Sequence, residues 1–143
     1  MMNQRFTIND LYVEKPENMI DVIVPFLRSK VSIVKDTNEV VLSSDLLLHK
    51  SAKLKVLYFL LGQCVLVFSG VGKEELIYSS SKSLQKKIGI SKNEADGVVK
   101  DLRMKNAIER VGKNNREVLY HIPKYRVRVV MDFITKINNK SEV

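Results

Sequence analysis

Residues 81–104 read SKSLQKKIGISKNEADGVVKDLRM, and this stretch decides the fold of the chain. Leu84 and Ile88 lie four residues apart, as on the buried face of a helix, and Gly89 follows where a left-handed C-terminal cap is expected. Residues 91–94 (SKNE) then form a capping box, in which the serine and glutamate side chains each bind the other residue's free backbone N–H group. A second helix therefore starts shortly after the first, and the two are predicted to form a helix-turn-helix.

The second helix of this unit has an apolar face and a polar face. Ala95, Val98, Val99 and Leu102 follow the i, i+3, i+4, i+7 spacing of a buried stripe. At about 100° per residue, the opposite face is predicted to carry the residues that a DNA groove would meet, which are Asn93, Asp96, Gly97, Lys100 and Met104.

The polar face has the chemistry of base recognition. Asparagine offers a paired donor and acceptor that match an adenine edge, lysine reaches guanine acceptors or a phosphate, and glycine lets the backbone come close. Each residue also has a purely structural interpretation, since Asn93 suits the first turn of a helix, Lys100 suits a solvated surface, and Gly97 costs a helix about 1 kcal/mol. Asp96 either weakens nonspecific binding or accepts a hydrogen bond from a cytosine amino group.

After Lys105-Asn106 the apolar pattern changes from helical to alternating, which predicts a β-hairpin. The polar segment 112–116 (GKNNR) is the predicted turn, with Lys113 and Arg116 at its tip. These cations would reach a phosphate backbone or a narrow minor groove, although an ordinary exposed hairpin tip has the same composition. The apolar residues of the two predicted strands are Ala107, Ile108 and Val111, then Val118, Tyr120 and Ile122.

A strongly apolar helix precedes the helix-turn-helix. It is predicted to start at Asp45 or Ser51, to reach Phe68 and to end at Gly70 and Gly72, with Leu54, Leu57, Tyr58 and Leu61 at helical spacing. The stretch 56–72 is about 17 residues long, at the lower limit for a membrane span. A helix buried at the centre of a small domain has the same pattern, and we favour that interpretation. Leu76-Ile77-Tyr78 is predicted as a short strand, and Ser80 or Ser81 as the cap of the next helix.

Both ends of the chain carry further elements. Residues 17–30 are predicted as a short amphipathic helix that Pro25 kinks or shortens, and residues 31–34 and 40–42 as a β-hairpin. Near the C-terminus, an apolar stripe on a helix needs a cover, either from the same chain or from a second copy. We favour a homodimer, with a dimerisation stripe of Val129, Val130, Phe133, Ile134 and Ile137.

The charge of the chain is concentrated in one segment. Lys and Arg total 24 against 16 Asp and Glu, which gives a net charge of +8, and the whole surplus lies within residues 82–128. A basic block of this kind is typical of a surface that contacts nucleic acid or acidic lipid, and a solvated lysine-rich face is the structural alternative.

The sequence offers little for catalysis. Cys64 is the single cysteine and lies among apolar residues, which predicts a buried thiol and a reducing, cytoplasmic environment. The N-terminus lacks the apolar core of a signal peptide. His49 and His121 are the only histidines, and no nucleophile or phosphate-binding motif occurs. We therefore predict no enzyme activity, no cofactor and no metal site.

In element order, residues 51–122 resemble the winged helix-turn-helix superfamily, which has a helix, a short strand, two more helices and a two-stranded wing. Asn114-Asn115-Arg116, followed by Val118, Tyr120 and Ile122, is similar to the wing of MarR-type regulators, where Asp-x-Arg precedes a strand. Here Asn114 replaces that aspartate. The resemblance implies that the second helix enters the major groove and that the wing contacts the flank. The N-terminal helix and hairpin are not a MarR feature.

These observations predict a mainly helical α+β fold, a winged helix-turn-helix with an N-terminal helix/hairpin extension and a C-terminal helix. The predicted divisions are an accessory part at 1–44, the winged helix at 45–123 and the terminal helix at 124–143. The predicted function is a regulator, transcriptional or replicon-type, that binds double-stranded DNA and not a membrane. The alternative is a protein-interaction module with an acidic partner. Base readout is assigned to Asn93, Asp96, Gly97 and Lys100, and phosphate or minor-groove contacts to Lys82, Lys86, Lys87, Lys92, Lys113 and Arg116.

Overall fold

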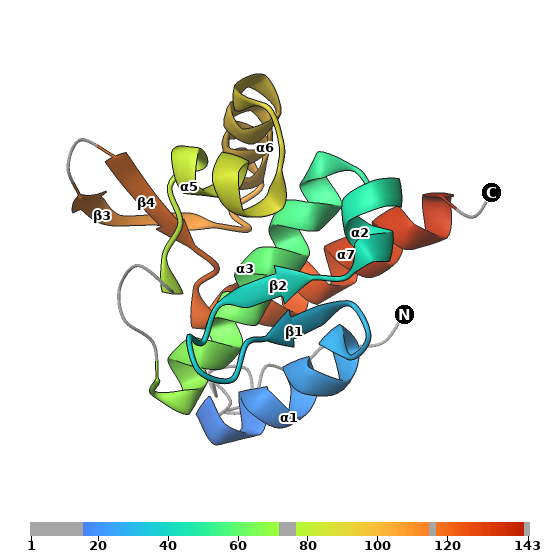
Figure 1. Cartoon of the computed structure of the whole chain (residues 1–143), viewed down its shortest axis with the longest axis vertical. Helices are drawn as coiled ribbons and strands as arrows, with labels where there is room; N and C mark the ends of the chain where they lie inside the picture. The colour runs from blue at the N-terminus through green and yellow to red at the C-terminus, as the bar shows by residue number, and fades with distance from the viewer. Residues whose placement is uncertain (1–15, 72–76, 115–116, 142–143) are drawn as a thin grey trace, which may run out of the picture.

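One central helix organises the fold. The computed structural model describes residues 16–71, 77–114 and 117–141 (Figure 1). Helix α3 (Ala52–Ser69) runs between the helix-turn-helix and wing on one side and the N-terminal elements on the other. All the other α-helices with described bounds and the N-terminal hairpin pack against it. Its residues from Val56 to Cys64 are all buried, so the prediction of a central core helix is confirmed.

Local signals set the two ends of α3. The hydroxyl of Ser51 accepts a hydrogen bond from the backbone N–H of Leu54 at 3.3 Å, and Gly70 ends the helix in the left-handed region at φ 71°. A separate short helix, α2 (Ser44–His49), precedes it, so the two predicted starting points belong to two helices. α3 is also long and apolar enough to cross a membrane, with a mean hydropathy of 1.5, but 61% of it is buried inside the fold.

The helix-turn-helix follows the predicted boundaries. Helix α5 (Ser81–Ile88) begins at a capping box formed by Ser80 and Ser83, and Gly89 ends it at φ 67°. Helix α6 (Lys92–Met104) begins at the capping box of Ser91 and Glu94. Leu84 and Ile88 are buried, and Ile90 fills the turn between the helices. The helix-turn-helix prediction is confirmed.

The wing departs from its predicted strands at both ends. Strand β3 (Glu109–Asn114) pairs antiparallel with β4 (Glu117–His121). Residues 112–114 were predicted as turn, which was wrong, because they pair with residues 117–119. Ala107 and Ile108 were predicted in the strand, which was also wrong, because β3 starts at Glu109. The N–H group of Ala107 bonds instead to the Leu102 carbonyl at 2.9 Å and completes the end of α6. The register shifts between Arg110 and Gly112, so the alternation assumed across residues 107–111 is not kept.

A single residue replaces the predicted strand before α5. Ile77 and Tyr78 form no strand, and Leu76 lies outside the described residues. Ser79 makes an isolated bridge to Tyr120, with N–O distances of 3.0 and 2.8 Å, and its hydroxyl donates to Gln63 Oε1 at 2.9 Å. The backbone N–H and C=O groups and the hydroxyl of this buried serine all have hydrogen-bond partners. Its polar groups are therefore paired without a longer strand.

The N-terminal elements share the core with α3. Helix α1 (Pro16–Leu27) buries Met19, Ile23 and Leu27 and continues past Pro25, and strands β1 (Val31–Ile33) and β2 (Val40–Leu42) form the predicted hairpin. Their buried residues belong to the same hydrophobic cluster as those of α3. One continuous core therefore includes residues on both sides of residue 44. The predicted boundary between an accessory part and the winged helix at this residue stays a prediction.

The C-terminal helix contributes to this core too. A 3₁₀ turn, η2 (Lys124–Arg126), leads into α7 (Val127–Ser141), which packs on α3. Of the predicted dimerisation stripe, Val130 and Ile134 are fully buried within the chain. Val129, Phe133 and Ile137 are half-buried, so these three keep surface that a second copy could cover.

The close approach of the hairpin to α3 yields a stability prediction. A Cβ at Gly62 would lie 2.7 Å from Val40 Cγ1 and 3.0 Å from Val31 Cγ1. We expect Gly62→Ala to lower the free energy of unfolding by about 1–3 kcal/mol through overpacking, despite the better helix propensity of alanine. The matched control is Gly97→Ala in α6, where nothing lies within 4 Å of the added Cβ. We expect this control variant to have a free energy of unfolding about 0.5–1 kcal/mol higher than that of the wild type. Urea unfolding measures both, and equal stability of the two variants would contradict the packing described here.

Candidate nucleic-acid interface

The outward face of α6 is polar, as its sequence predicts. Ala95, Val99 and Leu102 are buried and Val98 is half-buried. All the residues of the predicted polar face are exposed, and Met104 at the end of the helix is 75% exposed. The helix ends where Asn106 takes a left-handed conformation at φ 57°. A regular three-turn helix therefore presents Asn93, Asp96, Gly97, Lys100 and Met104 to solvent.

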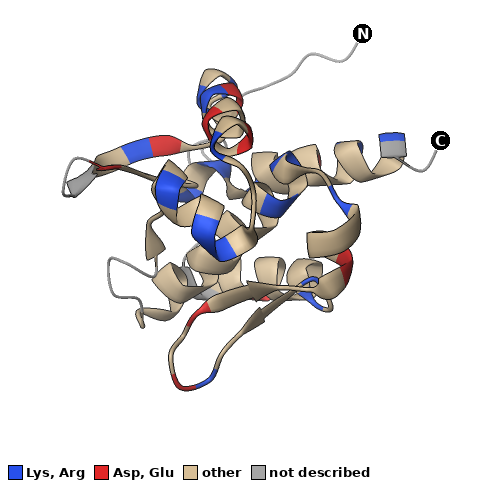
Figure 2. Ribbon diagram, turned by 45° about the horizontal axis from the view of Figure 1, so that its top comes forward, with Lys and Arg blue, Asp and Glu red and all other residues tan. Residues whose placement is uncertain are grey.

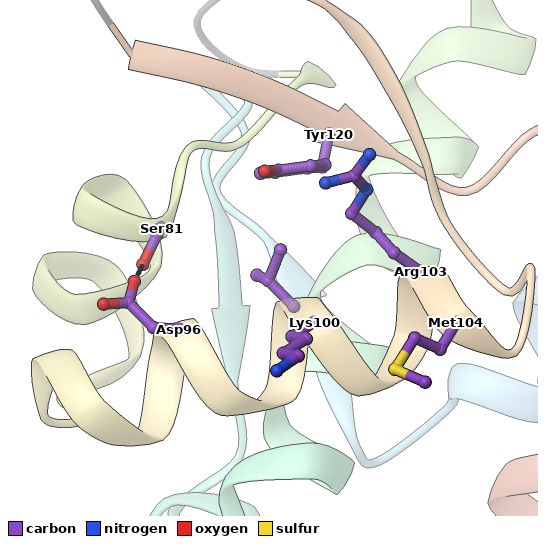
Figure 3. A pocket seen from close by; sticks show the side chains of 7 residues that line it. Ser81, Asp96, Lys100, Arg103, Met104 and Tyr120 are labelled. Atoms are coloured by element: carbon purple, nitrogen blue, oxygen red, sulfur yellow. Dashed lines mark hydrogen bonds between the residues drawn. The ribbon is translucent and has the colours of Figure 1, made fainter.

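Asp96 lies on this face but already has partners within the chain. Its Oδ1 accepts from the Ser81 hydroxyl at 2.5 Å and its Oδ2 from Lys92 Nζ at 3.1 Å (Figure 3). The Ser81 hydroxyl, followed by the Lys92 ammonium, lowers the pKa of the Asp96 carboxyl. The contact ties the first turn of α5 to α6, so Asp96 has a structural role beside any role in recognition.

The lysines of α5 divide between an outer stripe and a flank. Lys82 and Lys86 are exposed and lie opposite the buried Leu84 and Ile88, four residues apart on the same stripe. Lys87 lies on the flank, with its ammonium 5.9 Å from the ring centre of Phe59. Figure 2 shows basic residues on both helices and on the wing, with acidic residues among them. The contact of Ser81 with Asp96 places the first turn of α5 beside the polar face of α6.

A groove of about 400 Å³ lies between α6 and the wing. Figure 3 shows Lys100 and Arg103 on the α6 side and Tyr120 on the β4 side. The guanidinium of Arg103 lies 5.7 Å from the ring centre of Tyr120, within range of a cation–π contact. Tyr120 is in turn bridged to Ser79. The groove is lined by Ser81, Asp96, Val99, Lys100, Arg103, Met104 and Tyr120.

The predicted site residues do not include Arg103 or Tyr120, which contact each other in this groove. Arg103 lies seven residues after Asp96 and three after Lys100, so the helical spacing of α6 could have identified it. Tyr120 could not have been identified in this way, because its position depends on how the wing packs against the helix pair. Arg110 is a further exposed cation, paired in register with Tyr120.

The wing is described at its base but not at its tip. Lys113 is in register with Val118, but its side chain is outside the described part of the chain. Arg116 as a whole is outside the described residues. At the base, Glu109 Oε1 lies 3.1 Å from His121 Nε2, and Glu109 Oε2 accepts from the Tyr125 hydroxyl at 3.1 Å. The carboxylate of Glu109 raises the pKa of Tyr125. These contacts connect both wing strands to the turn that precedes α7.

The single cysteine and the possible metal ligands can be placed within the described part of the chain. Cys64 is buried, its Sγ lies 3.6 Å from the Ile122 carbonyl oxygen, and burial raises its pKa to about 12. The thiol therefore stays protonated at neutral pH. Within residues 16–71, 77–114 and 117–141, no three His, Cys, Asp or Glu side chains are grouped to hold a metal ion.

The contact of Asp96 with Ser81 predicts a measurable titration. We expect Ser81→Ala to raise the pKa of Asp96 toward its ordinary value, as followed by carboxyl ¹³C NMR. Because the folded-state pKa is lowered, the contact stabilises the fold above the unfolded pKa of about 3.9, and this stabilisation is lost as the pH falls through the folded value. Glu94 is the internal control, since its pKa is lowered by the backbone N–H and hydroxyl of Ser91 instead. An Asp96 titration that Ser81→Ala leaves unchanged would exclude the hydrogen bond in solution.

No family model matches the sequence, and no curated protein matches it. A search of solved structures finds a mutant of Lactococcus lactis ZitR, at 15% identity and a TM-score of 0.41, over 96% of this chain and 80% of that one. At a TM-score below 0.5, no property of that protein is carried over to this chain. The winged helix-turn-helix assignment rests on the order and packing of α3, α5, α6 and the wing in this chain.

Proposed function

We propose that the protein is a regulator, transcriptional or replicon-type, that binds double-stranded DNA. The observation that carries this proposal is the exposed polar face of α6, flanked by cations on α5 and beside the wing. A major groove about 12 Å wide admits one α-helix, and a polar face with amide and ammonium groups matches base edges better than it matches an apolar partner. The proposal includes a cytoplasmic location, a binding rather than catalytic role and no membrane partner.

Base readout is proposed for the outward residues of α6. Asn93, Gly97 and Lys100 form the centre of the face, and Arg103 is added at its edge, where the ring of Tyr120 restrains its guanidinium. An arginine held in place loses less side-chain entropy on binding, which favours a specific contact. Asp96 would read a cytosine only by exchanging its contacts with Ser81 and Lys92.

Phosphate contacts are proposed for the surrounding cations. Lys82 and Lys86 point outward from α5, whereas Lys92 is engaged with Asp96 and Lys87 lies over Phe59. Lys113 and Arg116 of the wing remain in the proposal on sequence grounds. Such contacts supply affinity and register but carry no base preference.

A homodimer is proposed through the half-buried part of the C-terminal stripe. Val129, Phe133 and Ile137 of α7 keep partial exposure and lie on one helix. Two copies related by a twofold axis would place two α6 helices on half-sites about 34–36 Å apart.

The alternative function is a protein-interaction module with an acidic partner on the same basic surface. The exposed Met104 next to the groove favours it, because methionine is common on adaptable protein-binding surfaces. Titration with DNA separates the two functions.

The first test is fluorescence anisotropy of a labelled random duplex at several salt concentrations. We expect Lys82→Ala with Lys86→Ala to weaken binding and to reduce the salt slope by about 1.8, from about 0.9 per lost phosphate contact. The matched control is Arg28→Ala with Lys35→Ala, which removes the same charge from the exposed N-terminal elements. A wild-type protein that binds no duplex at low salt would transfer support to the protein-interaction alternative.

The division between readout and affinity has its own test. A specific duplex is first selected from a random library. We expect Lys100→Ala to reduce the difference in binding free energy between this duplex and a random one by about 1–3 kcal/mol. Lys113→Ala and Arg116→Ala should weaken both duplexes alike. Equal losses on both duplexes for all three variants would contradict the assigned roles.

A further inference from the structure

A second groove, of about 310 Å³, lies on the other side of α6 from the wing, among α3, α6 and α7. Its apolar members are Leu57 and Leu102, which are fully buried, and Phe133 and Ile137, which are half-buried. The exposed apolar surface is therefore supplied mainly by α7. Four cations surround it, which are Lys53 of α3, Lys105 at the C-terminal cap of α6, and Lys136 and Lys140 of α7.

The cations of this groove are only partly compensated. The Oδ2 atom of Asp101 lies 2.5 Å from Lys53 Nζ and 3.2 Å from Lys105 Nζ. The lysine ammonium groups, that of Lys53 most, lower the pKa of the Asp101 carboxyl, so it stays charged at neutral pH. Among the described residues, no carboxylate lies within ion-pair distance of Lys136 or Lys140, which are one helical turn apart on α7. The groove thus combines an apolar floor with unbalanced positive charge.

This combination narrows the chemistry of an occupant. A second copy placed symmetrically on the groove would set lysine against lysine, which is unfavourable. Of the stripe proposed above for a homodimer, Phe133 and Ile137 line this groove and Val129 does not, so a homodimer that covers Phe133 and Ile137 would compete with the occupant of the groove. A duplex bound on the α6 polar face lies on the opposite side, since Leu102 projects about 200° from Lys100 around the helix. A small anion alone would leave the apolar floor uncovered. An occupant that matches both properties carries apolar groups on one side and carboxylates beside them.

We propose that the groove docks an acidic amphipathic helix of a partner protein. Apolar residues of that helix, spaced i and i+3 or i+4, would contact Phe133 and Ile137, as in other helix-in-groove complexes. Its carboxylates would pair with Lys136 and Lys140 at one side and with Lys105 at the other. The inference does not depend on DNA binding, because it rests on a different face of α6. If the protein also binds DNA, the two surfaces are free to act together and bring the partner to the site.

The experiment uses the full chain and a synthetic probe. The probe is a fluorescein-labelled, helix-forming peptide of Glu, Ala and Leu, about 14 residues long, with leucines at i, i+3, i+4 and i+7. A peptide with serine in place of leucine keeps the charge, and a peptide with glutamine in place of glutamate keeps the apolar stripe. We expect both to bind at least about tenfold more weakly than the probe in an anisotropy titration.

Two charge-reversed variants locate the binding surface. Lys136→Glu with Lys140→Glu should weaken probe binding at least about tenfold, whereas Lys82→Glu with Lys86→Glu, an equal charge change on α5, should alter it less than about threefold. Thermal unfolding of both variants checks that they fold. Amide chemical-shift changes on adding the probe should be centred on residues 133–140.

Several results would overturn the proposal. They are equal losses in the two charge-reversed variants, equal binding of the serine peptide, and no binding of the probe at about 1 mM. Displacement of the probe by a random duplex would assign the groove to the DNA surface instead. Failure of DNA binding in the salt titration leaves these outcomes unchanged, so the two proposals are tested separately.

Discussion

The burial of α3 is the constraint on which the rest of the structure depends. Apolar side chains cover nearly the whole circumference of this helix, and each fully buried leucine or phenylalanine contributes about 1.5–3 kcal/mol relative to exposure. A helix of this kind has to be covered on several sides at once. The N-terminal hairpin, the helix-turn-helix and α7 each cover one side, and Gly62 lets the hairpin come close.

The same helix positions the recognition surface. Gln63 is buried in α3, accepts from the hydroxyl of Ser79 and leaves its own Nε2 without a partner among the described residues. Ser79 is bridged to Tyr120, and the ring of Tyr120 lies under Arg103 of α6. A polar chain of contacts therefore runs from the core to the outer groove. These buried contacts favour the observed arrangement, because losing them would leave the hydroxyl and backbone groups of Ser79 unpaired as well.

Charge is distributed over α6 in two directions. Toward the wing, Lys100 and Arg103 border a groove with Tyr120, and toward α7, Lys105 and Asp101 join the lysines of α3 and α7. Val99 and Leu102 are buried and lie on α6 between these two charged surfaces. One helix thus serves two faces of different chemistry, polar with cations on one and apolar with cations on the other.

The sequence by itself determined the elements whose signals are local. The serine cap before α5, the capping box at Ser91, the C-terminal cap at Gly89 and the apolar stripe of α6 act within a few residues. The helix-turn-helix and its polar face were therefore predictable. Tertiary structure alone decided that Ser79 replaces a strand, that residues 112–114 extend the wing, and that α7 turns Val130 and Ile134 inward. It also decided the Arg103–Tyr120 contact and the lysine-rimmed groove. These features join residues far apart in the chain, and the energy of such contacts depends on packing that no local pattern encodes.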